Sequence, residues 1–207
     1  MNYLDEFLLI AISHFFAVAS PGPDFALVLK QSIQKGRNNA LVTSAGIATG
    51  ILVHVSYCVL GVAIVISQSP TVFAALKYLA AAYLAYIGVM ALRAKPADQQ
   101  AQQVQTNTQA ESMVKAFSRG FLVNALNPKA TLFFLSLFTL VISVETPITV
   151  QVGYGLYMAV ATLVWFSFLS IVLSRSKVRA FFLRAGHWFD RGIGVVLIGL
   201  AIRVVWV

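Results

Sequence analysis

The sequence predicts an all-α integral membrane protein in which six transmembrane helices form two inverted three-helix repeats. Three observations predict this fold: the composition, the spacing of the apolar stretches, and a proline motif found once in each half of the chain. Of the 207 residues, 59% are hydrophobic and 11% are charged, and the mean hydropathy is +0.82. A soluble domain is roughly 25% charged. We therefore expect lipid to cover most of this surface.

This composition excludes several classes of function. Soluble enzymes, secreted disulfide scaffolds and nucleic-acid-binding domains all need a polar surface that this chain lacks. Its net charge of +8 is spread between apolar stretches rather than gathered on one face, so no nucleic-acid partner is expected. Cys58 is the only cysteine, which excludes an internal disulfide and a thiolate metal site. No nucleophile–base pair, phosphate loop or dinucleotide fingerprint is present, so we expect neither an enzyme nor a cofactor.

Six apolar stretches approach the length of about 20 residues that a membrane-spanning helix needs. The last of them is short and begins at Ile193 or as early as Trp188. Proline in the first and fourth stretches predicts that helices 1 and 4 are broken. Acidic residues precede the first stretch, whereas a signal peptide begins with positive charge, so we expect no cleavage. The predicted spans are Phe7–Leu29, Ala40–Ser67, Val72–Leu92, Ala116–Val144, Val150–Leu173 and Ile193–Val207.

Lysine and arginine fall in alternate connections between these stretches. The first, third and fifth connections carry them, whereas the second and fourth carry none around residues 68–71 and 145–147. Because cytoplasmic loops are enriched in positive charge, both termini are predicted to lie outside. The third connection, residues 94–114, is rich in Gln, Ala and Thr and predicts a flexible cytoplasmic linker. A single transmembrane domain, 1–207, is thus divided into halves 1–93 and 115–207.

The two halves resemble each other around their prolines. When Pro21 is placed on Pro128, 107 positions away, a stripe of small and polar residues falls on a second stripe with the same helical spacing. An odd number of spans per repeat forces the halves into opposite orientations, as in many secondary transporters. Backbone groups freed at a break must pack against protein or face water. The stripes are Ser13, Ala17, Ser20, Asp24 and Gly120, Asn124, Asn127, Thr131.

Asp24 and Lys129 are the main candidates for chemistry, because charged groups within spans are costly. Each follows a proline and is predicted in the first turn of a half-helix. The helix dipole favours the negative charge there and disfavours the positive one. Lys129 has three possible placements: against Asp24, against an anionic substrate group, or toward a water-filled vestibule. A structural ion pair and a binding site for a zwitterion stay equal alternatives.

The remaining polar candidates have two interpretations each. Asn124 and Asn127 either bind substrate or satisfy backbone freed by Pro128. A histidine within a span carries a coupling proton or is a neutral packing residue, and the second interpretation is favoured. Asp24 is the better proton carrier, because burial disfavours an ionised carboxyl group. In the second span, Gly46 and Gly50 indicate close helix packing. The weaker candidates are His14, His54, Tyr57 and Trp165.

Three segments together resemble the LysE/RhtB family of amino-acid exporters, with similarity over essentially the whole chain. They are Ser20-Pro21-Gly22-Pro23-Asp24, Gly46…Gly50 and Asn127-Pro128-Lys129. Within the family the chain is most similar to threonine/homoserine exporters. The resemblance implies a bacterial inner-membrane protein, a homodimer, that exports amino acids in exchange for protons. It also implies site roles for the family's motif positions, which are Ser20, Pro21, Gly22, Pro23, Asp24, Asn127, Pro128 and Lys129.

The function predicted from the residues and the resemblance is a secondary exporter of threonine-like, homoserine-like or other small neutral or cationic amino acids. No ATP-binding motif is present, so protons are the expected energy source. Two alternatives stay open: a membrane scaffold or assembly partner that transports nothing, and an exporter of another small solute or a metal ion. Electron relay by thiols needs two cysteines and is excluded.

Overall fold

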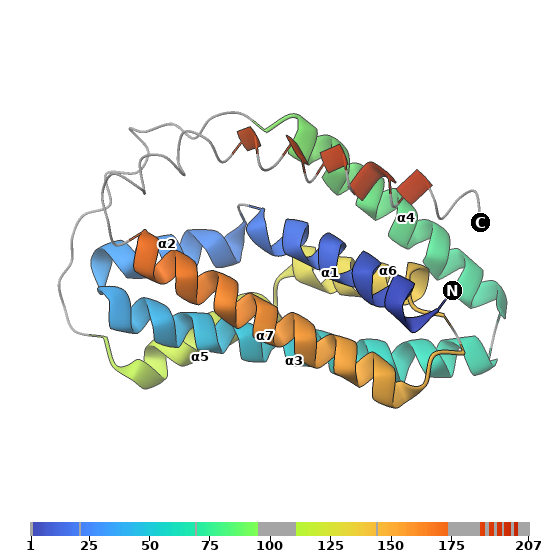
Figure 1. The fold of residues 1–207 in the computed structure, drawn as a ribbon, viewed down its shortest axis with the longest axis horizontal. Helices are drawn as coiled ribbons and strands as arrows, with labels where there is room; N and C mark the ends of the chain where they lie inside the picture. The colour runs from blue at the N-terminus through green and yellow to red at the C-terminus, as the bar shows by residue number, and fades with distance from the viewer. Residues whose placement is uncertain are drawn as a thin grey trace.

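The fold was analysed in a computed structural model. It describes residues 2–20, 22–68, 70–94, 111–143, 145–173, 187–188, 191–192, 194–195, 197–199 and 201–202. Within these ranges the chain is all-α and contains no strand. Its helices are α1 (Tyr3–Ala19), α2 (Pro23–Gln34), α3 (Arg37–Gln68), α4 (Pro70–Leu92), α5 (Met113–Ala125), α6 (Pro128–Leu140) and α7 (Ile148–Val172) (Figure 1).

Two of the predicted spans are broken helices. The axes of α1 and α2 differ by 51°, and those of α5 and α6 differ by 55°. Pro23 and Pro128 each stand in the first turn of the second half-helix, where the missing N–H of proline would have no helical acceptor. The predicted breaks in helices 1 and 4 therefore lie where the proline motifs lie. Pro21 itself falls outside the described residues.

The described helices account for part of the predicted membrane topology. Arg37–Gly61 of α3 and all of α7 are long and apolar enough to cross a membrane, and each bent pair adds one span if it crosses as a unit. Within α4, Ala81–Leu92 forms a shorter apolar helix. Of the predicted sixth span, Ile193–Val207, residues 194–195, 197–199 and 201–202 are described and helical. The rest of that span and most of the predicted linker lie outside the described residues, so the six-helix repeat arrangement stays a prediction.

Helix α3 runs along the length of the described fold and packs most extensively against α5 and α7 (Figure 1). The backbones of α3 and α5 touch. A Cβ added at Gly46 would lie 2.1 Å from the Phe117 carbonyl oxygen, and one added at Gly120 would lie 2.1 Å from the Thr43 carbonyl oxygen. The packing interpretation of the glycines is therefore confirmed for Gly46 and Gly50. At Gly61, farther along α3, no described atom lies within 4 Å of an added Cβ.

A small apolar cluster joins residue 84 of α4 to residues 197 and 201. The rest of the apolar interior forms two larger clusters along the long axis. One cluster joins α1 and α6 to residues 51–59 of α3 and 154–159 of α7. The other joins α2 to residue 47 of α3 and residues 166–173 of α7. The helix breaks fall between the two clusters, so the middle of the molecule is the place where apolar packing is interrupted.

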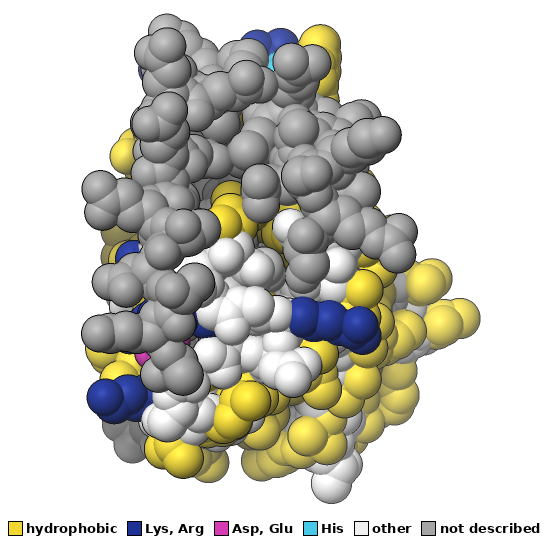
Figure 2. Space-filling view, turned by 90° about the vertical axis from the view of Figure 1, so that its left-hand side faces the viewer, with side chains coloured by type: hydrophobic (Ala, Val, Ile, Leu, Met, Phe, Trp, Pro, Cys, Tyr) yellow, Lys and Arg dark blue, Asp and Glu magenta, His cyan; other side chains and the backbone are white. Residues whose placement is uncertain are grey.

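A buried carboxylate ties the helices together at each end. At the N-terminal end of α1, Glu6 is fully buried and accepts hydrogen bonds from the Ser143 N–H (2.9 Å) and the Thr146 hydroxyl (2.9 Å). At the opposite end, Glu111 pairs with Arg119 (2.9 Å) and accepts from Gln31 (2.8 Å). Figure 2 views this second end, where polar, Lys and Arg side chains gather beside a hydrophobic flank.

The glycine contact allows a test against a matched control. Gly46→Ala places a methyl group against the α5 backbone, and we expect it to destabilise the protein by about 2 kcal/mol or more. Gly153→Ala meets no described atom within 4 Å and should be neutral or stabilising by up to about 1 kcal/mol. Thermal unfolding in detergent measures both. Equal melting temperatures for the two variants would contradict the close contact.

The Glu6 contacts predict a second stability effect. Glu6→Ala leaves the Ser143 N–H and the buried Thr146 hydroxyl without this acceptor, which should lower the free energy of unfolding by about 2 kcal/mol. Asp5→Ala, a change of the same type at an exposed neighbour, should alter stability by less than about 1 kcal/mol. The same unfolding assay applies. A stabilised Glu6→Ala protein would show that burying the charge outweighs its hydrogen bonds.

Candidate functional site

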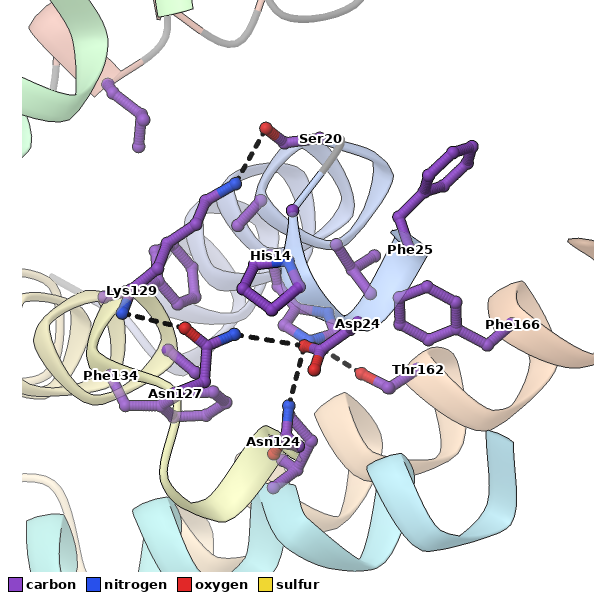
Figure 3. Close-up of a pocket in the computed structure, with 18 of the residues that line it drawn as sticks. His14, Ser20, Asp24, Phe25, Asn124, Asn127, Lys129, Phe134, Thr162 and Phe166 are labelled. Carbon is purple, nitrogen blue, oxygen red and sulfur yellow. Dashed lines mark hydrogen bonds between the residues drawn. The ribbon is translucent and has the colours of Figure 1, made fainter. Parts of the chain in front are cut away.

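A cavity of about 60 Å³ lies where the two broken helices meet (Figure 3). Ile51 of α3 and Thr162 of α7 line it. At about 1.5 Å of rise per residue, Thr162 lies roughly 21 Å from the start of α7 and roughly 15 Å from its end. The cavity is therefore near the middle of the span. Its polar lining includes His14, Ser20, Asp24, Asn124, Asn127 and Lys129, and its aromatic lining includes Phe25, Phe133, Phe134 and Phe166.

Asp24 extends from the first turn of α2 toward the two asparagines at the other break (Figure 3). Its Oδ2 accepts hydrogen bonds from the side-chain amides of Asn124 (3.0 Å) and Asn127 (3.5 Å). Its Oδ1 is buried and has no hydrogen-bond donor among the described residues. The Asn124 Oδ1 is also buried without a donor. Two buried acceptor atoms of cavity-lining residues are thus left without a donor from the described protein.

Lys129 extends from the first turn of α6 to the other broken helix, where its Nζ donates to the Ser20 hydroxyl at 2.8 Å. A Cβ on Gly22 would lie 3.5 Å from this Nζ, so the backbone of the first break also faces the ammonium group. Within the described ranges the only ion pair is Arg119–Glu111. The proposed direct ion pair between Asp24 and Lys129 is therefore absent from the structure.

The two asparagines fulfil one of the roles that the sequence left open, which is to satisfy the backbone freed by Pro128. Pro128 has no N–H to donate to the Asn124 carbonyl, four residues earlier, as a continuous helix would require. That carbonyl instead accepts from the Asn127 N–H (2.9 Å) and from the Nε2 of His54 (3.0 Å). The Asn127 side chain caps α6 by accepting from the Lys129 N–H (3.0 Å). Backbone groups, the His54 ring and the Asn127 side-chain oxygen thus provide hydrogen-bond partners at the break, while the side-chain NH₂ groups of both asparagines donate to Asp24.

The weaker candidates lie in different places. His14 is a buried part of the cavity wall, with its Nε2 3.1 Å from the Thr162 hydroxyl. His54 and Tyr57 are bonded to each other (2.7 Å) and do not line the cavity. Trp165 packs edge-on against Phe15, 5.6 Å between ring centroids, and also lies outside the lining.

Sequence reasoning missed part of the lining. Thr162 is a hydroxyl in an otherwise apolar stretch, a signal that was available because polar groups within a span need a partner. Phe133 and Phe134 gave no signal, because phenylalanines in an apolar helix are typical of packing. Among the described residues, no group of three or more His, Cys, Asp or Glu side chains could hold a metal ion.

Comparison with known proteins gives the family. The model of the LysE type translocator matches residues 15–206. The threonine efflux protein of Escherichia coli K12 is 26% identical, with 96% of this chain and 97% of that protein covered. The uncharacterized membrane protein YrhP of Bacillus subtilis is 29% identical, with 90% and 91% covered. No solved structure matches this chain. The chain belongs to the LysE type translocator family, and it is accordingly a multi-pass membrane transporter and not an enzyme.

Proposed function

We propose that this protein is a secondary transporter that exports small amino acids from the cytoplasm across the bacterial inner membrane. The observation that carries the proposal is the Asp24 carboxylate, which lies in the cavity between the broken helices with Oδ1 buried and without a described donor. A buried polar atom without a partner is costly. An ammonium group offers three donors and a positive charge, so the α-ammonium of an amino acid fits against this oxygen.

The carboxylate of the same amino acid also has candidate partners among the residues that line the cavity. Lys129 and Ser20 supply a cation and a hydroxyl donor, which together suit a carboxylate. The separation of Lys129 from Asp24 supports this assignment, because two groups already joined as an ion pair would be poorly available to a substrate. The aromatic lining leaves an apolar space for a side chain. Threonine, homoserine and other small neutral or cationic amino acids are the proposed substrates, in line with the name of the E. coli relative.

Proton antiport is the proposed energy source. A proton and the substrate ammonium compete for the same Asp24 carboxylate, because protonation removes the negative charge that holds the ammonium. A proton arriving from outside would therefore displace the amino acid, and release of that proton to the cytoplasm would prepare the site for the next one. Exchange of this kind couples the two fluxes through a single group, with each ligand excluding the other.

The proposed orientation follows from the charge distribution. Lys35, Arg37, Lys115 and Arg119 gather at the end where α2 ends and α3 and α5 begin (Figure 2). By the positive-inside rule this end faces the cytoplasm, with both termini outside and the 94–114 linker between halves 1–93 and 115–207 inside. The matching break positions in α1–α2 and α5–α6 support the inverted-repeat arrangement of those halves.

The first test is the loss of the carboxylate. Asp24→Asn keeps the shape but removes the charge, and we expect export of labelled threonine from proteoliposomes to fall roughly 10- to 100-fold, the effect of one charge-assisted contact. Asp5→Asn, an exposed aspartate of the same chain, serves as the matched control and should retain normal flux. Wild-type export by a correctly inserted Asp24→Asn protein would remove Asp24 from the proposed site.

The second test addresses coupling. In inverted membrane vesicles, the lumen corresponds to the outside of the cell, so an acidic lumen should drive accumulation of the labelled amino acid several-fold. A protonophore should abolish this accumulation, because it collapses the gradient without affecting the carrier. If uptake is the same with and without the gradient, proton antiport is wrong, although amino-acid export would stand.

A further inference from the structure

We infer that His54 is a positioning residue that supplies the hydrogen-bond donor missing from Pro128 and so holds Asn124 against Asp24. Its consequence for transport rests on the proposed function, whereas its structural basis does not. The starting point is the Asn124 carbonyl, which has lost the α-helical donor at position 128. The nearest replacement from another helix is the His54 ring, with its Nε2 at 3.0 Å.

The hydrogen-bond network fixes which ring nitrogen carries the proton. A carbonyl oxygen can only accept, so Nε2 must be the donor. The Nδ1 lies 2.7 Å from the Tyr57 hydroxyl, which can donate to the lone pair of a neutral ring. Both nitrogens are therefore used in the neutral Nε2–H tautomer. The ring plane is held by Phe134, which stacks on it at 5.4 Å between centroids and 11° between planes.

Helix α3 holds Asn124 at two points one turn apart. His54 contacts its carbonyl, and Gly50 faces its side chain, because a Cβ added at Gly50 would lie 2.7 Å from Asn124 Oδ1 and 2.9 Å from its Cβ. Positions four apart share one face of a helix. The Asn124 amide, held in this way, donates to Asp24 Oδ2 at 3.0 Å. A path of direct contacts thus runs from α3 through the second break to the carboxylate of the first.

This role differs from that of a proton carrier. His54 is fully buried and does not line the cavity. Both of its nitrogens have partners, one of which is a backbone carbonyl that cannot take up a proton in exchange. A carrier would need access to the cavity and a free position to receive the proton. His54 acts on the substrate site through Asn124 only.

Two substitutions separate the donor from the rest of the ring. His54→Gln places an amide nitrogen near the position of Nε2, whereas His54→Asn reaches only the position of Nδ1. We expect His54→Gln to keep the KM for the exported amino acid within about twofold of the wild type. His54→Asn should raise the KM by up to about tenfold, the effect of losing one of the two hydrogen bonds to the buried Asn124 carbonyl, with a smaller change in the maximal rate.

A control on the same helix distinguishes positioning from general stability. Ser44 makes a buried hydrogen bond to Ser170 (3.0 Å) and is not part of the cavity lining. Ser44→Ala should lower the melting temperature and leave the KM unchanged. Equal KM values for His54→Gln and His54→Asn would overturn the inference. Loss of the dependence on the proton gradient in His54→Gln would also overturn it, because it would make His54 a carrier.

Nuclear magnetic resonance tests the structural basis independently of transport. The chain has three histidines, so the signal of His54 in ¹⁵N-histidine-labelled protein in lipid is identified by its absence from His54→Gln. The expected signal is that of a neutral ring protonated at Nε2. A ring protonated at Nδ1, or at both nitrogens, would overturn the inference even if export and the Asp24 variants behave as proposed. The expected signal without amino-acid export would instead leave the positioning contact intact and reject the proposed function.

Discussion

The arrangement of the site depends on one constraint, which is that a helix broken inside a membrane must find partners for the backbone groups that the break releases. In α5–α6 several of those partners are visible. The Asn127 side chain caps the N-terminus of α6. At the C-terminus of α5, the Asn124 carbonyl accepts hydrogen bonds from the Asn127 N–H and from His54 of α3. The His54 hydrogen bond to the break forms only if α3 lies against it. The packing of α3 and the geometry of the site therefore depend on each other.

The contact between α3 and α5 follows from the same requirement. An imidazole on α3 can reach the Asn124 backbone only if the two helices approach closely, and Gly46 and Gly120 allow their backbones to touch. Gly46, Gly50 and His54 stand at spacings of four along α3, so one helical face provides both the close approach and the donor. Helix packing and site geometry are thus encoded by the same stripe of residues.

The sequence predicted the elements of this arrangement better than the partnerships within it. Proline positions predicted the breaks, and charge within an apolar span singled out Asp24 and Lys129, because both signals are local. Whether those two residues pair depends on the relative placement of two helices about 100 residues apart in the chain, and local signals carry no such information. The partners of His54 could not be predicted either, because a histidine within a span gives the same sequence pattern whether it binds a substrate or a backbone carbonyl.

The position of the cavity between two apolar clusters explains how a polar site is compatible with a stable membrane protein. On either side of the breaks, α3 and α7 pack continuous apolar faces against α1 and α6 or against α2. At the breaks, the backbone turns by more than 50°, and side chains from straight helices cannot fill the space that this bend opens. The buried Asp24 Oδ1 lies at that space. A ligand bound there would supply the missing donor and occupy volume that protein packing leaves empty, so its binding would relieve both deficits at once.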